Sequence, residues 1–126
     1  MERTLIDTNV LIDYLKGREQ ARPYIETIPA PAISVISVIE VLAGATVLEE
    51  IEIRQFFATL EKIPLSEDVI SHAISIRRFS IENSFKVKLP DAIICASAKA
   101  NGRYLITRDL DLVRLDPFLI RAPYKI

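Results

Sequence analysis

Short apolar runs alternate with longer helical segments along this chain, and the alternation limits the folds that it can adopt. The runs that predict strands are residues 3–6, 32–35 and 104–107. The segments that predict helices are 10–16, part of 18–29, 36–44, 46–62, 67–83 and 90–101. Residues 63–65 predict a short strand or turn, and the tail 112–126 is ambiguous. Alternating strands and helices predict an α/β fold with a central parallel sheet, helices on both faces and right-handed crossovers.

Several of these helix ends carry the residues that commonly cap helices. Gly17 can end the first helix, and Gly102 stands where the residue after a helix C-terminus belongs. Ser66 is a good N-cap for helix 67–83, and Pro90 suits the first turn of its helix. Five apolar residues are expected on the buried side of helix 67–83: Val69, Ile70, Ala73, Ile74 and Ile81.

The composition excludes several kinds of chemistry. The chain has 126 residues, half of them hydrophobic, which suits a single domain over 1–126. Its single cysteine, Cys95, and single histidine, His72, exclude an internal disulfide and zinc sites built from cysteine or several histidines. No apolar run approaches the roughly 20 residues of a membrane span, so we expect a cytoplasmic protein with no membrane partner. The formal net charge of −1 gives no general attraction to nucleic acids.

Acidic side chains follow two of the predicted strands. Asp7 comes directly after residues 3–6, and Asp109 and Asp111 follow residues 104–107. Functional groups gather beyond the carboxyl ends of parallel strands, so these acids are candidate site residues. Taken singly, Asp7 or Thr8 could be a helix N-cap, and Asp109 and Asp111 could be ordinary turn residues.

Two further acids lie on predicted helices. Asp91 lies in the first turn of its helix, where the helix dipole alone would favour an acid. Glu40 lies in the most apolar helix of the chain, on one side with Ser34, Ser37 and Gly44. That side could face water, or it could border a cleft in which the carboxylate is paired.

Together these acids indicate a metal site. Three or four carboxylates that meet in one cleft repel each other and stay partly protonated. A divalent cation removes this repulsion, and a site with only oxygen ligands suits Mg²⁺ or Mn²⁺. Such an ion binds substrate phosphate, lowers the pKa of a bound water and stabilises the leaving oxygen. The acids therefore predict metal-dependent hydrolysis of a phosphodiester bond.

Four ordered blocks of the sequence carry a family resemblance: LIDTNVLIDYL, ISVISVIEVLAG, LPDAIICASAKANG and YLITRDLDLVRL. They resemble the PIN-domain ribonucleases, specifically the small VapC-type toxins of prokaryotic toxin–antitoxin pairs. The resemblance implies a three-layer α/β/α sandwich and Mg²⁺- or Mn²⁺-dependent cleavage of RNA. Asp7, Glu40 and Asp91 match the three invariant acids of that family. Asp109 matches a fourth, more variable acid, and Asp111 could share or assume its role.

The resemblance also implies residues that support the acids. Asn9 matches a polar support after the first acid, and Thr107 matches a hydroxyl beside the metal site. Ser37 could lie behind the ligands. Asp13, by contrast, is expected on the solvated side of its short helix.

Two protein partners are implied by the resemblance: a second copy in a homodimer, and a cognate antitoxin. The C-terminal segment of such an antitoxin wraps the toxin and brings a basic side chain to the acids, where it competes with the metal. Exposed apolar residues on helices 47–62 and 67–83 would supply its groove. Two adjacent phenylalanines, Phe56 and Phe57, cannot both point inward on one helix, so one of them could belong to this groove. Alternatively, the two rings could pack against elements on opposite sides of the helix.

Basic residues offer candidate contacts to RNA. Four of them lie within twelve residues and just before Asp91: Arg77, Arg78, Lys86 and Lys88. They could follow an RNA backbone toward the metal, although a solvated helix surface is the commoner reason for such a run. Arg108 adjoins Asp109 and is a better candidate for a phosphate contact, unless it pairs with an acid instead.

Two other classes of function stay open on the sequence. One is a catalytically inactive PIN-like binding module, which the presence of all four acids disfavours. The other is a different Mg²⁺-dependent nuclease or phosphatase on a similar fold. The sequence DTN does not fit the usual surroundings of an aspartyl phosphatase nucleophile.

Overall fold

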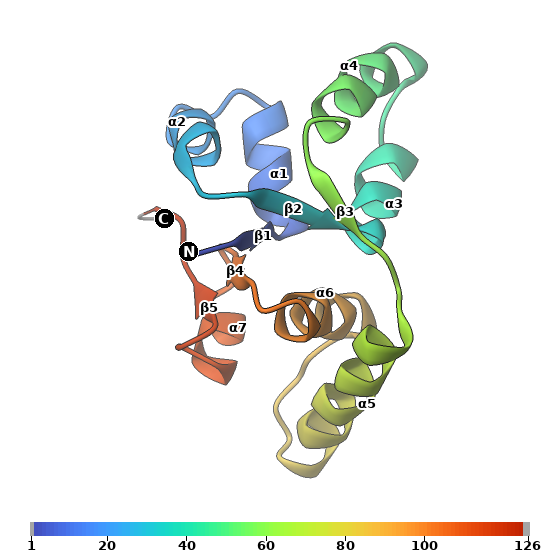
Figure 1. The fold of residues 1–126 in the computed structure, drawn as a ribbon, viewed down its shortest axis with the longest axis vertical. Helices are drawn as coiled ribbons and strands as arrows, with labels where there is room; N and C mark the ends of the chain where they lie inside the picture. The colour runs from blue at the N-terminus through green and yellow to red at the C-terminus, as the bar shows by residue number, and fades with distance from the viewer. Residues whose placement is uncertain (1, 125–126) are drawn as a thin grey trace.

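A five-stranded parallel sheet forms the centre of the molecule, as a computed structural model of residues 2–124 shows (Figure 1). Its strands lie in the order β3 (Glu61–Ile63), β2 (Pro31–Ser34), β1 (Thr4–Ile6), β4 (Tyr104–Ile106) and β5 (Ile120–Arg121). Strands β1 and β4 pair in register from Thr4–Tyr104 to Ile6–Ile106. The predicted parallel sheet is therefore confirmed, with β1 in the middle and Asp7 directly beyond its end.

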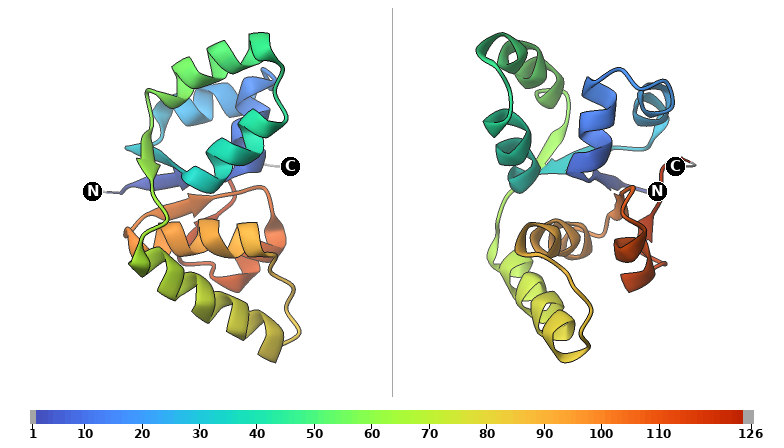
Figure 2. Two further views of the ribbon diagram at one scale, coloured as in Figure 1. Left: turned by 90° about the vertical axis from the view of Figure 1, so that its right-hand side faces the viewer. Right: turned by 180° about the vertical axis from the view of Figure 1, so that it is seen from behind.

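Helices cover both faces of this sheet, which confirms the α/β/α sandwich (Figures 1 and 2). One layer consists of α1 (Thr8–Leu15), α2 (Ala21–Thr27), α3 (Val35–Ala43) and α4 (Val47–Phe57). The other consists of α5 (Glu67–Glu82), α6 (Leu89–Ala100) and α7 (Leu110–Leu115). None of the helices within residues 2–124 is long and apolar enough to cross a membrane.

Alternating strand residues divide the core between the two layers. Leu5 and Leu105 pack with the α6 layer, whereas Ile6 and Ile106 pack with the layer of α1 to α4. Successive side chains of a strand point to opposite faces, so apolar neighbours are needed when both faces are covered. Both cores therefore meet at β1 and β4, and they hold the carboxyl ends of these strands rigidly.

Side chains cap several helices as the sequence predicted. The Ser66 hydroxyl accepts a hydrogen bond from the Val69 N–H at 3.2 Å, and Pro90 lies in the first turn of α6. Gly102 follows α6 with a φ of 61°, in the left-handed region that glycine enters without strain. These local signals fix where α5 begins and where α6 begins and ends.

The edge strand β3 and the tail of the chain differ from the prediction. The strand near residues 63–65 is β3, which begins earlier at Glu61, so helix α4 ends at Phe57 rather than near residue 62. The ambiguous tail forms α7 and β5. Glu61 and Lys62 are exposed at the sheet edge, so β3 has no apolar alternation to mark it.

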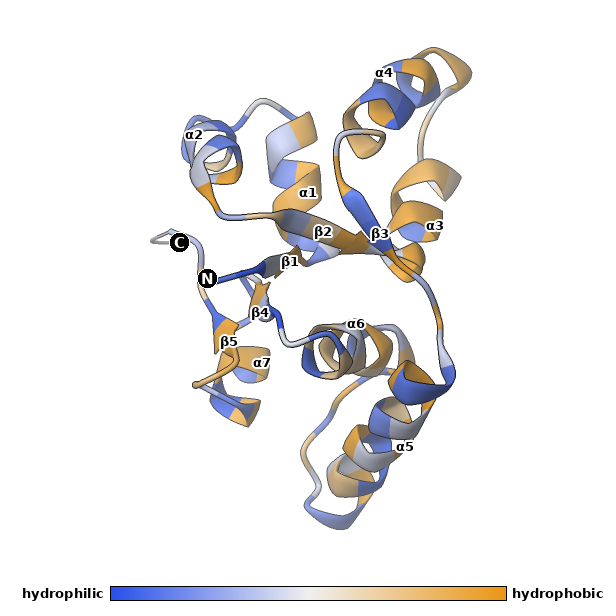
Figure 3. Ribbon diagram, in the orientation of Figure 1, coloured by the Kyte–Doolittle hydropathy of each residue, from blue (hydrophilic) through white to orange (hydrophobic). Residues whose placement is uncertain are grey.

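The apolar side of α5 is less buried than predicted. Val69 and Ala73 pack against Ala96 of α6, but Ile70, Ile74 and Ile81 are 37%, 47% and 72% exposed. Only a narrow stripe of α5 faces α6, so the remaining isoleucines reach solvent. Figure 3 shows apolar residues on the outer helices α4 and α5 as well as in the core.

Candidate metal centre

Asp7 links the end of β1 to the start of α1. Its side chain is 4% exposed, and it is the N-cap of α1. The Thr8 N–H donates to Oδ1 at 2.7 Å, and the Thr107 hydroxyl donates to Oδ2 at 2.7 Å. The cap role and the site role therefore fall on one residue, whose two oxygens are each held in a fixed direction.

The carboxyl group of Asp7 is buried, which is an unusual environment for a group that can carry a charge. The pKa of Asp7 is raised from 3.8 to about 6, mainly because burial disfavours the charged form and to a lesser extent because of the charges of Asp91 and Glu40. The hydrogen bonds from Thr107 and Thr8 act in the opposite direction, because they favour the ionised form. Asp7 is thus a desolvated carboxylate that lies within electrostatic reach of two others.

Thr107 organises the loop that follows β4. Its buried hydroxyl donates to Asp7 and accepts from Asn9 Nδ2 at 3.2 Å and from the Asp109 N–H at 3.0 Å. The Asn9 Oδ1 accepts from the Arg108 N–H at 3.2 Å. Asn9 therefore supports the loop after β4 and reaches Asp7 only through Thr107.

Glu40 is exposed, yet it is tied to the same site. The Thr8 hydroxyl donates to Glu40 Oε1 at 2.8 Å and lies 2.9 Å from the hydroxyl of the buried Ser37. Thr8 was predicted only as a possible cap and was missed as a support of Glu40. A hydroxyl directly after the first acid, at the start of a helix, is the signal that could have identified it.

Asp91 and Asp109 complete the group of interacting acids. Burial raises the pKa of the half-buried Asp91, and the charges of Asp109 and Glu40 raise it further, whereas Lys88 lowers it. Asp109 is the N-cap of α7 and accepts from the Asp111 N–H at 2.9 Å. The Asp111 side chain is exposed and lies 2.8 Å from Arg114. Of Asp109 and Asp111, Asp109 is the one whose charge acts on Asp91.

These acids interact through charge without being gathered around one point. Among residues 2–124, no three acidic, histidine or cysteine side chains are placed closely enough to hold an ion between them. Mg²⁺ commonly binds through only one or two carboxylates and keeps several waters, so it does not require three converging side chains. The oxygen-only donor set fits a hard divalent cation, as does the raised pKa of Asp7, because a cation offsets the repulsion.

The predicted basic residues take different positions. Arg77 is half-buried, and its Nη1 donates to the Val87 carbonyl at 2.6 Å, so it holds the α5–α6 loop. Arg78, Lys86 and Lys88 are exposed. Lys88 is the one of these three whose charge acts on Asp91.

Arg108 pairs with an acid, and that acid is Asp13. Its Nε lies 2.6 Å from Asp13 Oδ2, and the Asp13 side chain is 2% exposed. The expectation of a solvated Asp13 is therefore wrong. The short helix α1 is covered on this side by the loop after β4, which a helical pattern alone does not reveal.

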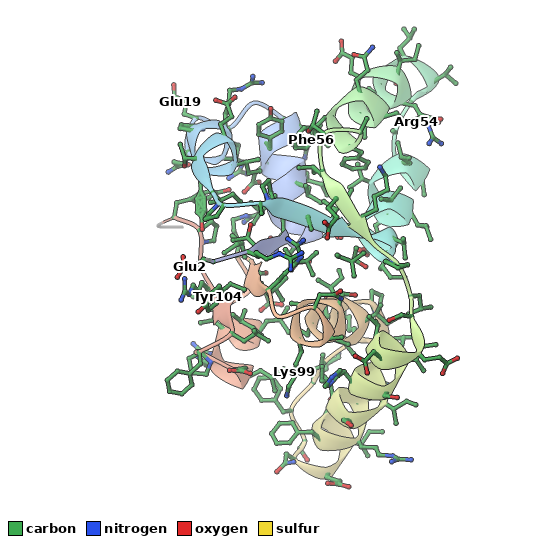
Figure 4. The ribbon with its side chains drawn as sticks, viewed as in Figure 1. Glu2, Glu19, Arg54, Phe56, Lys99 and Tyr104 are labelled. Atoms are coloured by element: carbon green, nitrogen blue, oxygen red, sulfur yellow. The ribbon has the colours of Figure 1, made fainter. Side chains whose placement is uncertain are left out.

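Phe56 and Phe57 both pack within the structure. Phe57 is 2% exposed in the core, and Phe56 stacks on Tyr14 of α1 with ring centroids 4.3 Å apart. Figure 4 shows Phe56 between α4 and α1. The two rings thus pack on different neighbours, which was the alternative that the sequence left open. The exposed apolar residues of α4 are instead Val47, Leu48 and Ile51.

Fold and site together define a class of protein: a parallel α/β/α sandwich with interacting acids at the carboxyl edge of its sheet. The family model described as PIN domain matches residues 4–117. The chain belongs to the PIN-domain family, which confirms the resemblance found in the sequence.

Individual relatives agree with this family. Ribonuclease VapC10 of Mycobacterium tuberculosis is 28% identical over 106 residues, which cover 82% of this chain and 80% of the relative. A toxin–antitoxin complex from Klebsiella pneumoniae contains a chain that is 36% identical, with a TM-score of 0.85 and coverage of 98% of this chain and 99% of that one. A DNA-bound VapBC from Salmonella typhimurium, 21% identical over 98% of this chain and 100% of its own, shares the fold with a TM-score of 0.87.

Proposed function

We propose that this protein is a Mg²⁺- or Mn²⁺-dependent endoribonuclease and the toxin of a toxin–antitoxin pair. The single observation that carries the proposal is the electrostatic grouping of Asp7, Glu40, Asp91 and Asp109 at one edge of the sheet. Its PIN-domain membership and its similarity to the ribonuclease VapC10 support the choice of RNA as substrate.

In this proposal the acids hold the cation and the surrounding residues hold the acids. Asp7 and Asp91 would be the principal ligands, with Asp109 and Glu40 beside them. A bound cation would polarise the scissile phosphate and lower the pKa of a bound water. The hydroxyls of Thr107 and Thr8 keep Asp7 and Glu40 in fixed orientations.

The basic residues would receive the RNA backbone. Lys88 stands next to the helix that carries Asp91 and is exposed, so it is the best placed of them. Lys86 and Arg78 would extend this contact along the loop, because both are exposed near it. Arg77 and Arg108 are engaged within the protein and would contribute less directly.

An antitoxin would cover the surface formed by helices α3 and α4. A cleft of about 260 Å³ lies between α1, α3 and α4, with Ile12, Val41 and Ile53 in its wall and Glu40 at its border. Apolar residues of the antitoxin would fill this cleft, and a basic side chain could then reach Glu40. Val47 and Leu48, which are 83% and 80% exposed on α4, would be buried by the same segment. A homodimer is proposed on the family resemblance.

Substitution of the acids tests the nuclease. Asp7→Asn and Asp91→Asn should each reduce cleavage of tRNA in Mg²⁺ or Mn²⁺ by at least about a hundredfold, because each removes a charged ligand. Asp109→Asn should reduce it more than Asp111→Asn, since Asp111 is paired with Arg114. Glu50→Gln removes an exposed carboxylate of α4 and serves as the control.

The outcomes separate the classes of function. Unchanged cleavage in Asp7→Asn or Asp91→Asn would refute the assignment of the site. Harmless induced expression of the wild-type protein, together with RNA binding but no cleavage, would favour an inactive binding module. Cleavage of single-stranded DNA or a small phosphomonoester in preference to RNA would indicate a different phosphoryl-transfer enzyme.

A further inference from the structure

We propose that Asp13 is a positioning residue that fixes, through Arg108, the segment carrying Thr107 and Asp109. The inference rests on the proposed function, because it concerns the geometry of the proposed metal site. Asp13 itself lies outside that group of acids, on the side of α1 that the loop after β4 covers.

Asp13 is the centre of a small charged cluster. Its Oδ2 lies 2.6 Å from Arg108 Nε, and its Oδ1 lies 3.4 Å from Arg18 Nε. The Tyr124 hydroxyl donates a hydrogen bond to Oδ2. The Tyr124 ring also packs edge-on against Tyr24 of α2, with centroids 6.2 Å apart. One buried carboxylate therefore joins α1, the loop after β4 and the last described residue of the chain.

The contacts of Arg108 connect this cluster to the acids. Arg108 stands between Thr107, which donates to Asp7, and Asp109, whose N–H donates to Thr107. Its own N–H donates to Asn9, and its side chain pairs with Asp13. Asn9 and Asp13 lie one helical turn apart, so both face the same side of α1.

Helix α1 thus holds the three-residue segment 107–109 at three points. Asp7 holds Thr107, Asn9 holds the Arg108 backbone, and Asp13 holds the Arg108 side chain. Because Asp7 begins the same helix, α1 fixes the position of the first acid relative to Asp109. The Thr107 N–H also donates to the Arg121 carbonyl at 3.0 Å, so the contact with Asp13 chiefly restrains the Arg108 part of the segment.

Stability alone is a weak reason for such a pair. A buried ion pair commonly contributes no more to stability than apolar residues of similar volume would, because both charges lose their hydration. What the pair does provide is a fixed place for the Arg108 side chain, because its Nε lies 2.6 Å from the buried Asp13 carboxylate, although this N–H makes no hydrogen bond within the described residues. The same engagement makes Arg108, at 27% side-chain exposure, less available to a phosphate.

The first test uses the metal-free protein. The order of the segment can be followed at the backbone amides of Asp109, Asp111 and Leu112. These three amides donate hydrogen bonds to the side chains of Thr107 or Asp109, which belong to the segment. In Asp13→Asn these amides should exchange with deuterium at least about tenfold faster than in the wild type. Arg18→Ala removes the exposed partner of Asp13 and should change their exchange by less than about twofold.

The second test uses the metal and RNA. Asp13→Asn should weaken Mn²⁺ binding, measured by calorimetry, about tenfold and should lower kcat, while KM for RNA stays within about twofold. Arg108→Met should have the same effects, and Asp13→Glu should restore part of the affinity. If Asp13→Asn does not fold, Tyr124→Phe removes one contact of the same carboxylate and should shift exchange and Mn²⁺ affinity in the same direction by a smaller factor.

Each result decides the inference. Wild-type exchange and Mn²⁺ affinity in a folded Asp13→Asn, or in Tyr124→Phe if that variant must replace it, would overturn it. A raised KM in Arg108→Met alone, with Asp13→Asn unaffected, would make Arg108 a phosphate contact and would also overturn it. If the wild-type protein cleaves no RNA, the proposed function fails, while amide exchange and Mn²⁺ affinity still decide whether Asp13 positions the segment.

Discussion

At the scale of single residues, Asp7 shows how the site works against the stability of the metal-free protein. Its folded-state pKa of about 6 lies above the ordinary 3.8 because the carboxylate is buried near other acids. The folded state then binds the proton more tightly than the unfolded state does. The stabilisation that follows is complete below about pH 4 and is lost as the pH rises through about 6.

Replacement of Asp7 by asparagine should therefore stabilise the metal-free protein at pH 7. The pKa difference corresponds to about 3 kcal/mol, and some of it is offset because the amide cannot accept both hydrogen bonds. We expect Asp7→Asn to raise the free energy of unfolding by about 1–3 kcal/mol at pH 7 in chelator, with no gain at pH 4. Urea unfolding at the two pH values measures this, with Glu50→Gln as the control. A less stable Asp7→Asn at pH 7 would contradict the assigned electrostatics.

Asp7 and Asp13 also show what residue patterns can and cannot predict. The place of Asp7 follows from the sequence, because an acid directly after a strand buried on both faces lies at the carboxyl edge of a parallel sheet. Asp13 was misplaced because its helix has only eight residues and its covering loop comes from residues nearly a hundred positions later. Helical periodicity reports the face that packs on the core, and it carries no information about such a distant loop.

At the scale of elements, the bounds of a helix with a strong capping signal were predicted accurately, whereas the bounds of the edge strands were not. Helix α5 was predicted over 67–83 and spans Glu67–Glu82, because Ser66 caps it. Strand β3 contains two exposed polar residues, and β5 has only two residues, so neither has a sequence pattern that predicts a strand. The two strands form because β3 pairs with β2 and β5 pairs with β4. The place of the α5–α6 loop was predicted by the ends of the two helices that flank it, whereas its specific contacts were not.

We expect that loop to depend on Ser80 and Arg77. The Ser80 hydroxyl, which is buried, donates to the Phe85 carbonyl and accepts from the Val87 N–H at 3.0 Å, and Arg77 donates to the Val87 carbonyl. Ser80→Ala should lower the free energy of unfolding by about 1–3 kcal/mol, because the buried Val87 N–H and the part-buried Phe85 carbonyl lose their partner. Arg77→Ala should act in the same direction, whereas the exposed Arg78→Ala should stay within about 0.5 kcal/mol.

Thermal and urea unfolding measure these differences, and RNA cleavage separates structure from binding. If Arg77 holds the loop, Arg77→Ala should lose stability with or without RNA present. Equal stability of Arg77→Ala and wild type, combined with a raised KM, would instead make Arg77 a direct RNA contact. Arg77 would then bind the substrate and would not hold the loop.

At the scale of the whole molecule, the site depends on segments far apart in the chain. Asp7 and Asp109 come from two strand–helix junctions, Asp91 from the first turn of α6 and Glu40 from the interior of α3, and the fold brings them toward one edge of the sheet. The sequence predicted that these acids would lie near one edge of the sheet, because the topology of alternating strands and helices fixes that edge, but within residues 2–124 they do not converge on one point. It could not predict their spacing, which depends on hydroxyl contacts such as those of Thr8 and Thr107.

A cation that binds these acids should stabilise the whole fold. At a Mn²⁺ concentration about 100 times its Kd, linkage adds about 2.7 kcal/mol, or roughly 10 °C in Tm for a chain of this size. The increase should shrink as the pH falls through about 6, because protonation of Asp7 competes with the metal. In Asp7→Asn less than half of the increase should remain, while Glu50→Gln should show all of it. Scanning calorimetry with Mn²⁺ or EDTA measures these shifts, and an equal increase in Asp7→Asn and wild type would place the ion elsewhere.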